Sequence, residues 1–124
     1  MKVCIPTMEK GGMDDELSEH FGGAPTFTII DTETKDVKVV QNQSDHFGGE
    51  GKPPEHIENL GAKVVICRGI GPKAMIMLRD FDIDVYLGST GNAKTAFEMW
   101  SAGKLQKASI QNACQGHGHG HSCH

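Results

Sequence analysis

The alternation of strand and helix is clearest in residues 63–88, which read KVVICRGIGPKAMIMLRDFDIDVYLG. The apolar runs at 63–67 and 84–88 are short and lie next to glycine-rich segments, which is typical of buried strands. Between them, the segment 72–81 begins with a proline and has apolar residues at helical spacing. A strand, a helix and a second buried strand in this order predict two parallel strands joined by a right-handed crossover.

The same reasoning extends outward from this unit. A helix is expected at 92–103 and a short, proline-led helix at 53–60. The N-terminal half adds an apolar strand at 2–6. Two β-branched strands at 26–31 and 37–41 follow, and the polar turn between them predicts a hairpin. The whole pattern is that of an α/β protein with a mainly parallel sheet.

Strand direction gathers the glycine-rich loops at one edge of this predicted sheet. If the strand at 26–31 runs antiparallel to the strand at 2–6, the loop between them lies at the carboxyl edge of the first strand. The hairpin then returns the chain to the same edge. The loops after the strands at 63–67 and 84–88 also leave from it. Open α/β sheets usually bind ligands at this edge, so we expect the internal glycine clusters to frame one cleft.

Length and composition limit the classes of function. The chain has 124 residues, a formal net charge of -4 and a pI near 5.9. It has no long run of lysine or arginine, which argues against nucleic acid as a partner. No apolar run reaches membrane-spanning length or forms a secretory signal. We therefore expect a cytoplasmic protein, in which four cysteines without a CxxC pair act as thiols or metal ligands.

A hexapeptide occurs twice in almost the same form, as SEHFGG at 18–23 and as SDHFGG at 44–49. Its imidazole can bind iron, copper, zinc or a cluster, and its glycines let a bulky ligand approach the backbone. The alternative is structural: the histidine bonds to its own loop and the phenylalanine anchors that loop in the core. Two copies on one edge favour a ligand role for His20 and leave both roles open for His46. The candidate cofactor-binding residues are His20, Phe21, Gly22, His46 and Gly48, with both histidines as candidate metal ligands.

The segment after the strand at 63–67 offers a further set of candidates. Cys67 ends the strand, and Arg68 would favour its thiolate, a ligand for soft metals and iron-sulfur clusters. A buried, apolar cysteine fits the sequence equally well. Gly69 and Gly71 precede a helix whose N-terminal amides attract anions. A dinucleotide-binding motif is only partly present, because its third glycine is missing. The candidate cofactor-binding residues here are Cys67, Arg68, Gly69 and Gly71.

The tail, residues 111–124, contains the sequence NACQGHGHGHSCH. Histidine alternates with glycine between two cysteines, and almost no apolar side chain is available to pack. We expect a flexible segment whose imidazole and thiol groups bind a transition metal. The alternatives are an end without a role or an affinity tag, and the cysteines and alternating glycines argue against a tag. The candidate metal ligands are Cys114, His117, His119, His121, Cys123 and His124.

The segment SEHFGGAPTF at 18–27 resembles the dinitrogenase iron-molybdenum cofactor family. Its motif S-x-H-F-G-x-A-x-x-F is met by Ser18, His20, Phe21, Gly22, Ala24 and Phe27. The resemblance covers residues 1–110, which we expect to be one domain, and includes the GIG loop at 69–71. It implies a three-layer, ribonuclease-H-like α/β fold with a five-stranded mixed sheet and helices on both faces. It also implies that the protein binds or carries an iron-sulfur or molybdenum-containing cluster, with His20 as the ligand.

The leading prediction is a small non-catalytic carrier or assembly protein. It would hold an anionic metal cluster through His20 while loop amides, Arg68 or Lys73 balance the charge, and it would exchange the cluster with an assembly or acceptor protein. The alternative is a regulatory module that binds a nucleotide or another phosphate ligand at the glycine-rich edge. A nuclease needs carboxylates that converge on two metal ions, and the strand at 2–6 has none. We therefore expect that the protein is not an enzyme.

Overall fold

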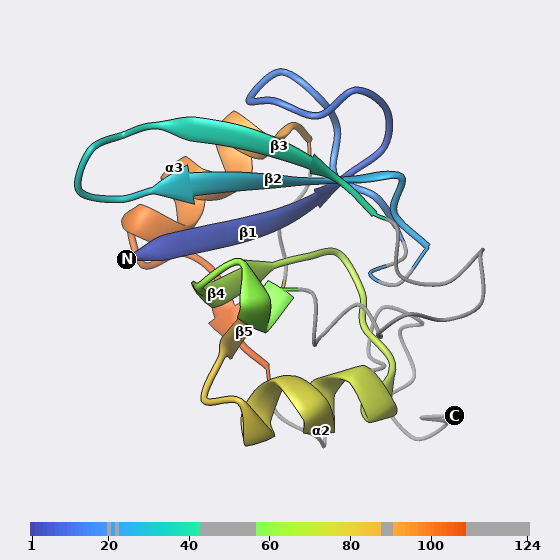
Figure 1. The fold of residues 1–124 in the computed structure, drawn as a ribbon. Helices are drawn as coiled ribbons and strands as arrows, with labels where there is room; N and C mark the ends of the chain where they lie inside the picture. Colours follow the sequence, from blue (N-terminus) through green and yellow to red (C-terminus); the bar gives the residue numbers. More distant parts are fainter. Residues whose placement is uncertain (20, 22, 43–56, 88–90, 109–124) are drawn as a thin grey trace.

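The chain forms a mixed sheet with helices packed against it (Figure 1). The structure, a computed structural model, describes residues 1–19, 21, 23–42, 57–87 and 91–108. Within these ranges the sheet has six strands in the order β3-β2-β1-β4-β5-β6. The strands are β1 (Lys2–Thr7), β2 (Thr26–Asp31), β3 (Val37–Gln41), β4 (Ala62–Ile66), β5 (Asp84–Leu87) and β6 (Gln106–Lys107). The helices are α2 (Pro72–Asp80) and α3 (Ala93–Ser101), and residues 57–59 are also helical.

Strand directions agree with the expected topology. β1, β4 and β5 are parallel to one another, and β2 runs antiparallel to β1 and forms a hairpin with β3. The prediction of five strands is wrong for the described chain, because β6 adds a sixth that pairs antiparallel with β5. β6 has only two residues, Gln106 and Lys107, and both are exposed. Such a strand has no hydrophobic pattern that could reveal it in the sequence.

Two apolar clusters lie on opposite faces of the sheet. On β1, Cys4 belongs to one cluster, whereas Val3 and Ile5 belong to the other. Met75 of α2 packs in the cluster of Cys4, and Ala96 of α3 packs in the cluster of Val3 and Ile5. Successive strand residues point to opposite faces, so α2 covers one face and α3 covers the other. We call these the α2 face and the α3 face.

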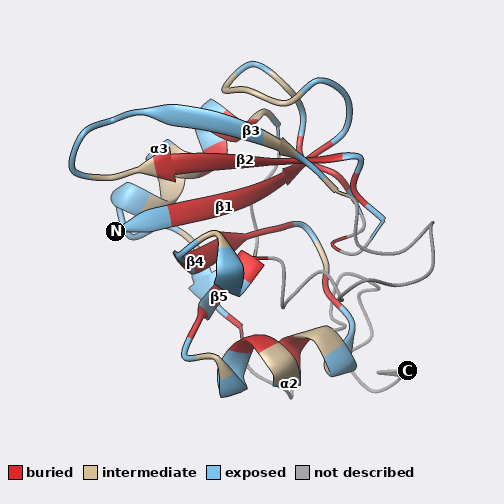
Figure 2. Cartoon of the chain, viewed as in Figure 1, coloured by how far each residue is buried: buried red, intermediate tan, exposed pale blue. Residues whose placement is uncertain are grey.

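Burial is concentrated in the centre of the sheet. In Figure 2, β1 and β2 are almost entirely buried, whereas the outer strand β3 is mostly exposed. Each fully buried Val, Leu, Ile or Phe side chain stabilises the fold by about 1.5–3 kcal/mol relative to an exposed one. The central strands therefore form a rigid support for the loops at their ends.

Local chemistry sets the ends of the helices. Asn92 caps α3, because its side-chain oxygen accepts a hydrogen bond from the Thr95 amide at 2.9 Å. α2 begins with Pro72 directly after Gly71, and Phe81 ends it. Both helices stop slightly earlier than the sequence predicted. With nine residues each, neither is long enough to cross a membrane, and no other helix among the described residues is.

Candidate functional site

The carboxyl ends of β1, β4 and β5 meet at one edge of the sheet, which we call the rim. Thr7, the last residue of β1, pairs with Thr26 at the start of β2. Thr26 pairs in turn with Gln41, the last residue of β3. The arrowheads of β1 and β3 in Figure 1 accordingly point the same way, while that of β2 points the opposite way. The loops after β1, β3, β4 and β5 therefore all leave the sheet at the rim, as strand direction predicted.

Hydrogen bonds join the segments that flank the two hexapeptides. Asn42, two residues before the second copy, donates from its side-chain amide to the Ala24 carbonyl at 2.8 Å. Its backbone amide donates to the Pro25 carbonyl at 3.0 Å. Ala24 directly follows the first copy, and it is buried. The segment that follows the first hexapeptide and the segment that precedes the second therefore lie side by side.

The loops after β4 and β5 contact the same region. A Cβ atom added to Gly69 would lie 3.6 Å from the carbonyl oxygen of Glu19. The Leu17 amide donates to the Gly91 carbonyl at 3.1 Å, and the Ser18 amide donates to the Pro6 carbonyl at 2.9 Å. Segments that are far apart in the sequence thus converge around residues 17–19.

Phe21 holds the first motif against the core. Its side chain is only 3% exposed and packs beside Phe27, with ring centroids 6.0 Å apart. Both rings belong to the cluster on the α2 face. The structure therefore agrees with the anchoring role considered for the phenylalanine of this motif. Because its ring is buried, Phe21 attaches this part of the motif to the core.

Positive charge and helix amides lie next to this junction. Arg68 and Lys73 are exposed, and neither forms an ion pair with any described residue. Gly71 precedes α2, whose first turn has no side-chain cap and no acidic residue. At α3 the situation differs, because loop carbonyls of Asp15 and Met13 accept hydrogen bonds from its first amides. The N-terminus of α2 is therefore the better of the two for an anion.

Comparison with known proteins assigns the chain to a family. Residues 1–103 match the family described as dinitrogenase iron-molybdenum cofactor. The chain belongs to this family. An uncharacterized protein of Methanocaldococcus jannaschii is 30% identical over 112 residues, which cover 86% of this chain and 91% of that protein.

Solved structures of similar proteins share the fold. The solution structure of a candidate NifB protein from Thermotoga, assigned to the DUF35 family, is 28% identical with a TM-score of 0.74. The match covers 86% of this chain and 91% of that one. The apo form of the orange protein from Desulfovibrio gigas is 24% identical with a TM-score of 0.75, over 87% of this chain and 92% of that one. At this lower identity the likeness shows the fold alone.

Most ligands predicted from the sequence lie outside the described residues, and their roles stay predictions. Among the residues that the structure describes, no group of three histidine, cysteine, aspartate or glutamate side chains forms a metal site. The structure does describe the backbone on both sides of the histidine of the family motif. The predicted residues outside the described ranges are His20, Gly22, His46, Gly48, Cys114, His117, His119, His121, Cys123 and His124.

Cys67 lies in the core. Its side chain is fully buried in the cluster on the α2 face, and burial raises the pKa of its thiol to about 12. The thiol is therefore protonated at neutral pH, although clusters and soft metals bind the thiolate. Cys4 is buried in the same cluster, and burial, followed by the nearby Cys67, raises its pKa well above the usual value. The buried alternative therefore fits Cys67 better than the ligand role.

A polar network below the rim was not recognised in the sequence. The Oγ1 atoms of Thr7 and Thr26 share a hydrogen bond of 2.6 Å, and Thr28 Oγ1 lies 3.2 Å from Thr7 Oγ1. Thr28 Oγ1 also accepts a hydrogen bond from the Gly12 amide at 2.9 Å. The three buried hydroxyls thus attach the loop after β1 to the sheet. The repeat of threonine at 26 and 28 was the available signal, since alternate strand residues share a face.

Asp15 organises the same loop. One carboxylate oxygen accepts hydrogen bonds from the amides of Glu9 and Gly11, both at 2.8 Å. The other accepts from the Glu16 amide at 2.8 Å. Gly11 has a φ of +81°, and a Cβ atom there would lie 2.5 Å from Val39. Asp15 and the conformation of Gly11 therefore order the loop between β1 and residues 17–19.

Proposed function

We propose that this protein is a small, non-catalytic carrier or assembly protein that binds an iron-sulfur or molybdenum-containing cluster at the rim. Membership of the dinitrogenase iron-molybdenum cofactor family supports a cluster-binding role in general terms. The observation that carries the proposal is the junction of loops: Asn42 bonds to the segment after the first hexapeptide, and Gly69 lies against Glu19. Loops anchored in this way favour a shared ligand site.

In this proposal the histidines provide the ligands and the loop after β4 provides the charge. His20 binds a metal of the cluster, with His46 as a second ligand. Arg68, Lys73 and the amides at the start of α2 stabilise the negative charge of the cluster. Cys67 is left out of the ligand set, because its thiol is buried and protonated.

The proposal has three further parts. The strand order β3-β2-β1-β4-β5 with β2 antiparallel supports a ribonuclease-H-like classification, with β6 added at the edge. Residues 111–124 form a separate tail that binds a transition metal through its histidines and cysteines. The carrier acts in the cytoplasm and exchanges its cluster with an assembly or acceptor protein.

Oxygen-free reconstitution tests the proposal. The wild-type protein and the variants His20→Ala and His46→Ala are incubated with iron, sulfide and molybdate, desalted, and measured by visible absorption and metal analysis. We expect His20→Ala to retain about tenfold less cluster than the wild type, which corresponds to a loss of about 1.4 kcal/mol of binding free energy. His56 lies outside both hexapeptides and the tail, so His56→Ala serves as the matched control and should retain the cluster. Equal retention by His20→Ala and the wild type would remove His20 from the site.

A phosphate-binding regulatory module is the second candidate. The uncapped start of α2 supports it, since Gly71 leaves space for an anion close to the first amides. Calorimetry with inorganic phosphate and a panel of nucleotides discriminates between the two proposals. A cluster carrier should give no saturable heat with nucleotides. A regulatory module should give heat that Lys73→Ala reduces.

A further inference from the structure

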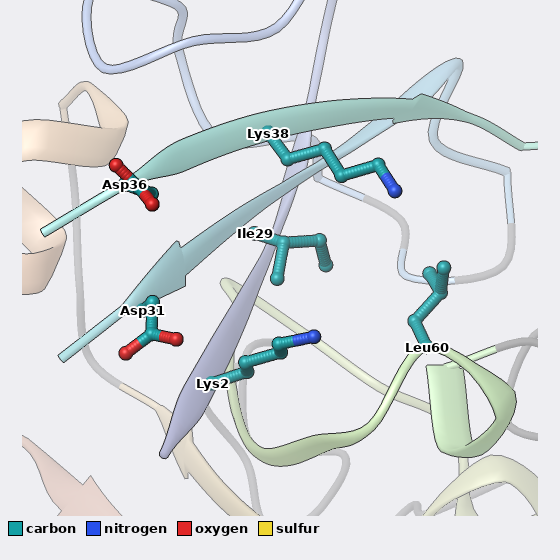
Figure 3. A pocket seen from close by; sticks show the side chains of 6 residues that line it. All are labelled: Lys2, Ile29, Asp31, Asp36, Lys38 and Leu60. Atoms are coloured by element: carbon teal, nitrogen blue, oxygen red, sulfur yellow. The ribbon is translucent and has the colours of Figure 1, made fainter. Parts of the chain in front are cut away.

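A pocket of about 260 Å³ lies at the edge of the sheet opposite the rim. We propose that it binds a small zwitterion whose ammonium and carboxylate groups are separated by an aliphatic segment. This ligand site is independent of the rim and of any cluster bound there. The residues that line it are Lys2, Ile29, Asp31, Asp36, Lys38 and Leu60 (Figure 3).

Strand register brings the lining residues onto one face of the sheet. Lys2 pairs with Asp31 across β1 and β2, and Ile29 pairs with Lys38 across β2 and β3. Residues directly opposite each other in antiparallel strands project from the same face. The Asp31 amide also donates to the Asp36 carbonyl at 2.9 Å, which sets these two residues beside each other. Ile29 belongs to the cluster on the α2 face, so the pocket opens on that face.

The two lysines supply a positive end. In Figure 3 the side chains of Lys2 and Lys38 extend from different strands toward the side of the pocket where Leu60 lies. No carboxylate among the described residues lies within 4.0 Å of either ammonium group. Lys38 can therefore bind the carboxylate of a ligand without first breaking an ion pair, whereas the charge of Lys2 also acts on Asp31, which lies opposite it.

The two aspartates supply a negative end. Figure 3 shows Asp31 and Asp36 on the other side of Ile29 from the lysine ammonium groups. One oxygen of Asp31 accepts hydrogen bonds from the amides of Glu33 and Thr34 at 2.8 and 3.3 Å. These amides lower the pKa of Asp31 from its usual value, so this carboxyl stays ionised in neutral and mildly acidic solution. Its second oxygen and Asp36 are available for an ammonium group.

An apolar surface separates the two ends. Ile29 is 5% exposed and forms the floor, and Leu60 is half-buried beside it. A cation or an anion alone would match one end and leave the other end without a partner. A zwitterion with an aliphatic middle matches both ends and covers the apolar surface. The small volume and the exposed charges together predict weak, salt-sensitive binding.

The test uses ε-aminocaproate as the probe and NMR of the isotope-labelled protein as the measurement. We expect saturable shifts at the amides of Lys2, Ile29 and Lys38. Caproate lacks the ammonium group and n-hexylamine lacks the carboxylate, so each should bind about tenfold more weakly, which corresponds to about 1.4 kcal/mol. The proposal is wrong if ε-aminocaproate gives no saturable shift at these amides up to about 10 mM. It is also wrong if caproate or n-hexylamine binds as tightly as the zwitterion.

Variants then assign the two ends. Lys38→Met should weaken ε-aminocaproate and caproate about tenfold. Asp36→Asn should weaken ε-aminocaproate and n-hexylamine but not caproate. Lys94→Met is the matched control, because Lys94 is exposed on α3 at the other face of the sheet, and it should change nothing. Thermal unfolding monitors the fold of each variant. If Lys38→Met is folded and binds the probe like the wild type, the probe binds elsewhere and the assignment fails.

Discussion

The two edges of the sheet are built by different means. At the rim, amides and carbonyls of Leu17, Ser18 and Pro25 join the loops, and buried threonine hydroxyls and the Asp15 carboxylate hold the loop after β1. At the opposite edge, side chains of three paired strands form most of the pocket, and Asp36 and Leu60 complete it. The rim is joined by contacts between its loops, whereas the chemistry of the opposite edge is set by strand register. This difference is consistent with the two unrelated sites that we propose on one small sheet.

The largest expected effect comes from removing the anchor under the rim. Phe27 is fully buried and packs against Phe21. We expect Phe27→Ala to lower the free energy of unfolding by about 3–5 kcal/mol, because it leaves a cavity in the core. The matched change at the other edge is Leu60→Ala. That side chain is only half-buried, so we expect about 1 kcal/mol. Denaturant unfolding measures both values, and equal losses would show that Phe27 anchors the fold no more strongly than Leu60 does.

A smaller effect is expected at the loop after β1. Asp15→Ala removes the acceptor for three backbone amides. A buried hydrogen bond to a charged group is worth about 1.5–3 kcal/mol. Because the Asp15 carboxylate is only partly buried, we expect the free energy of unfolding to fall by about 2 kcal/mol in total. Asp14 is exposed and is the matched control. We expect Asp14→Ala to stay within about 0.5 kcal/mol of the wild type in urea unfolding. If the two variants lose the same stability, Asp15 does not order the loop.

The rim could be predicted from the sequence because it depends on strand direction alone. In a hairpin of 26–31 and 37–41, the start of the first strand and the end of the second lie at the same edge of the sheet. The first hexapeptide precedes that start and the second follows that end, and the contacts of Asn42 agree with this arrangement. Side-chain roles were harder to predict. Cys67 follows a strand, and the sequence does not reveal whether its thiol faces the core or the solvent.

The pocket at the opposite edge could not be predicted. Its charged residues are those of any exposed strand end, and only the register of Lys2 against Asp31 and of Ile29 against Lys38 brings them together. A shift of one residue in either pairing would turn the side chains to the other face. Asp15 was missed for a related reason, because its role depends on the loop conformation that Gly11 adopts.

The pH dependence of stability tests whether Cys67 belongs to the core or to the rim. Its folded pKa is raised to about 12 from an ordinary value of 9.0. The contribution of the buried thiol is therefore complete below pH 9.0 and is lost as the pH rises toward 12. In this window the unfolded state loses the proton that the folded state keeps, so stability falls by up to about 1.4 kcal/mol per pH unit.

Cys67→Ala should make the curve shallower by that amount between these pH values, apart from a constant loss due to the smaller side chain. Cys67→Ser and Cys67→Ala should have parallel curves, because neither side chain ionises there. If the slope of wild type and Cys67→Ala is the same, the thiol ionises as freely in the folded protein as in the unfolded one. Such a thiol would be accessible at the rim, and Cys67 would return to the set of cluster ligands.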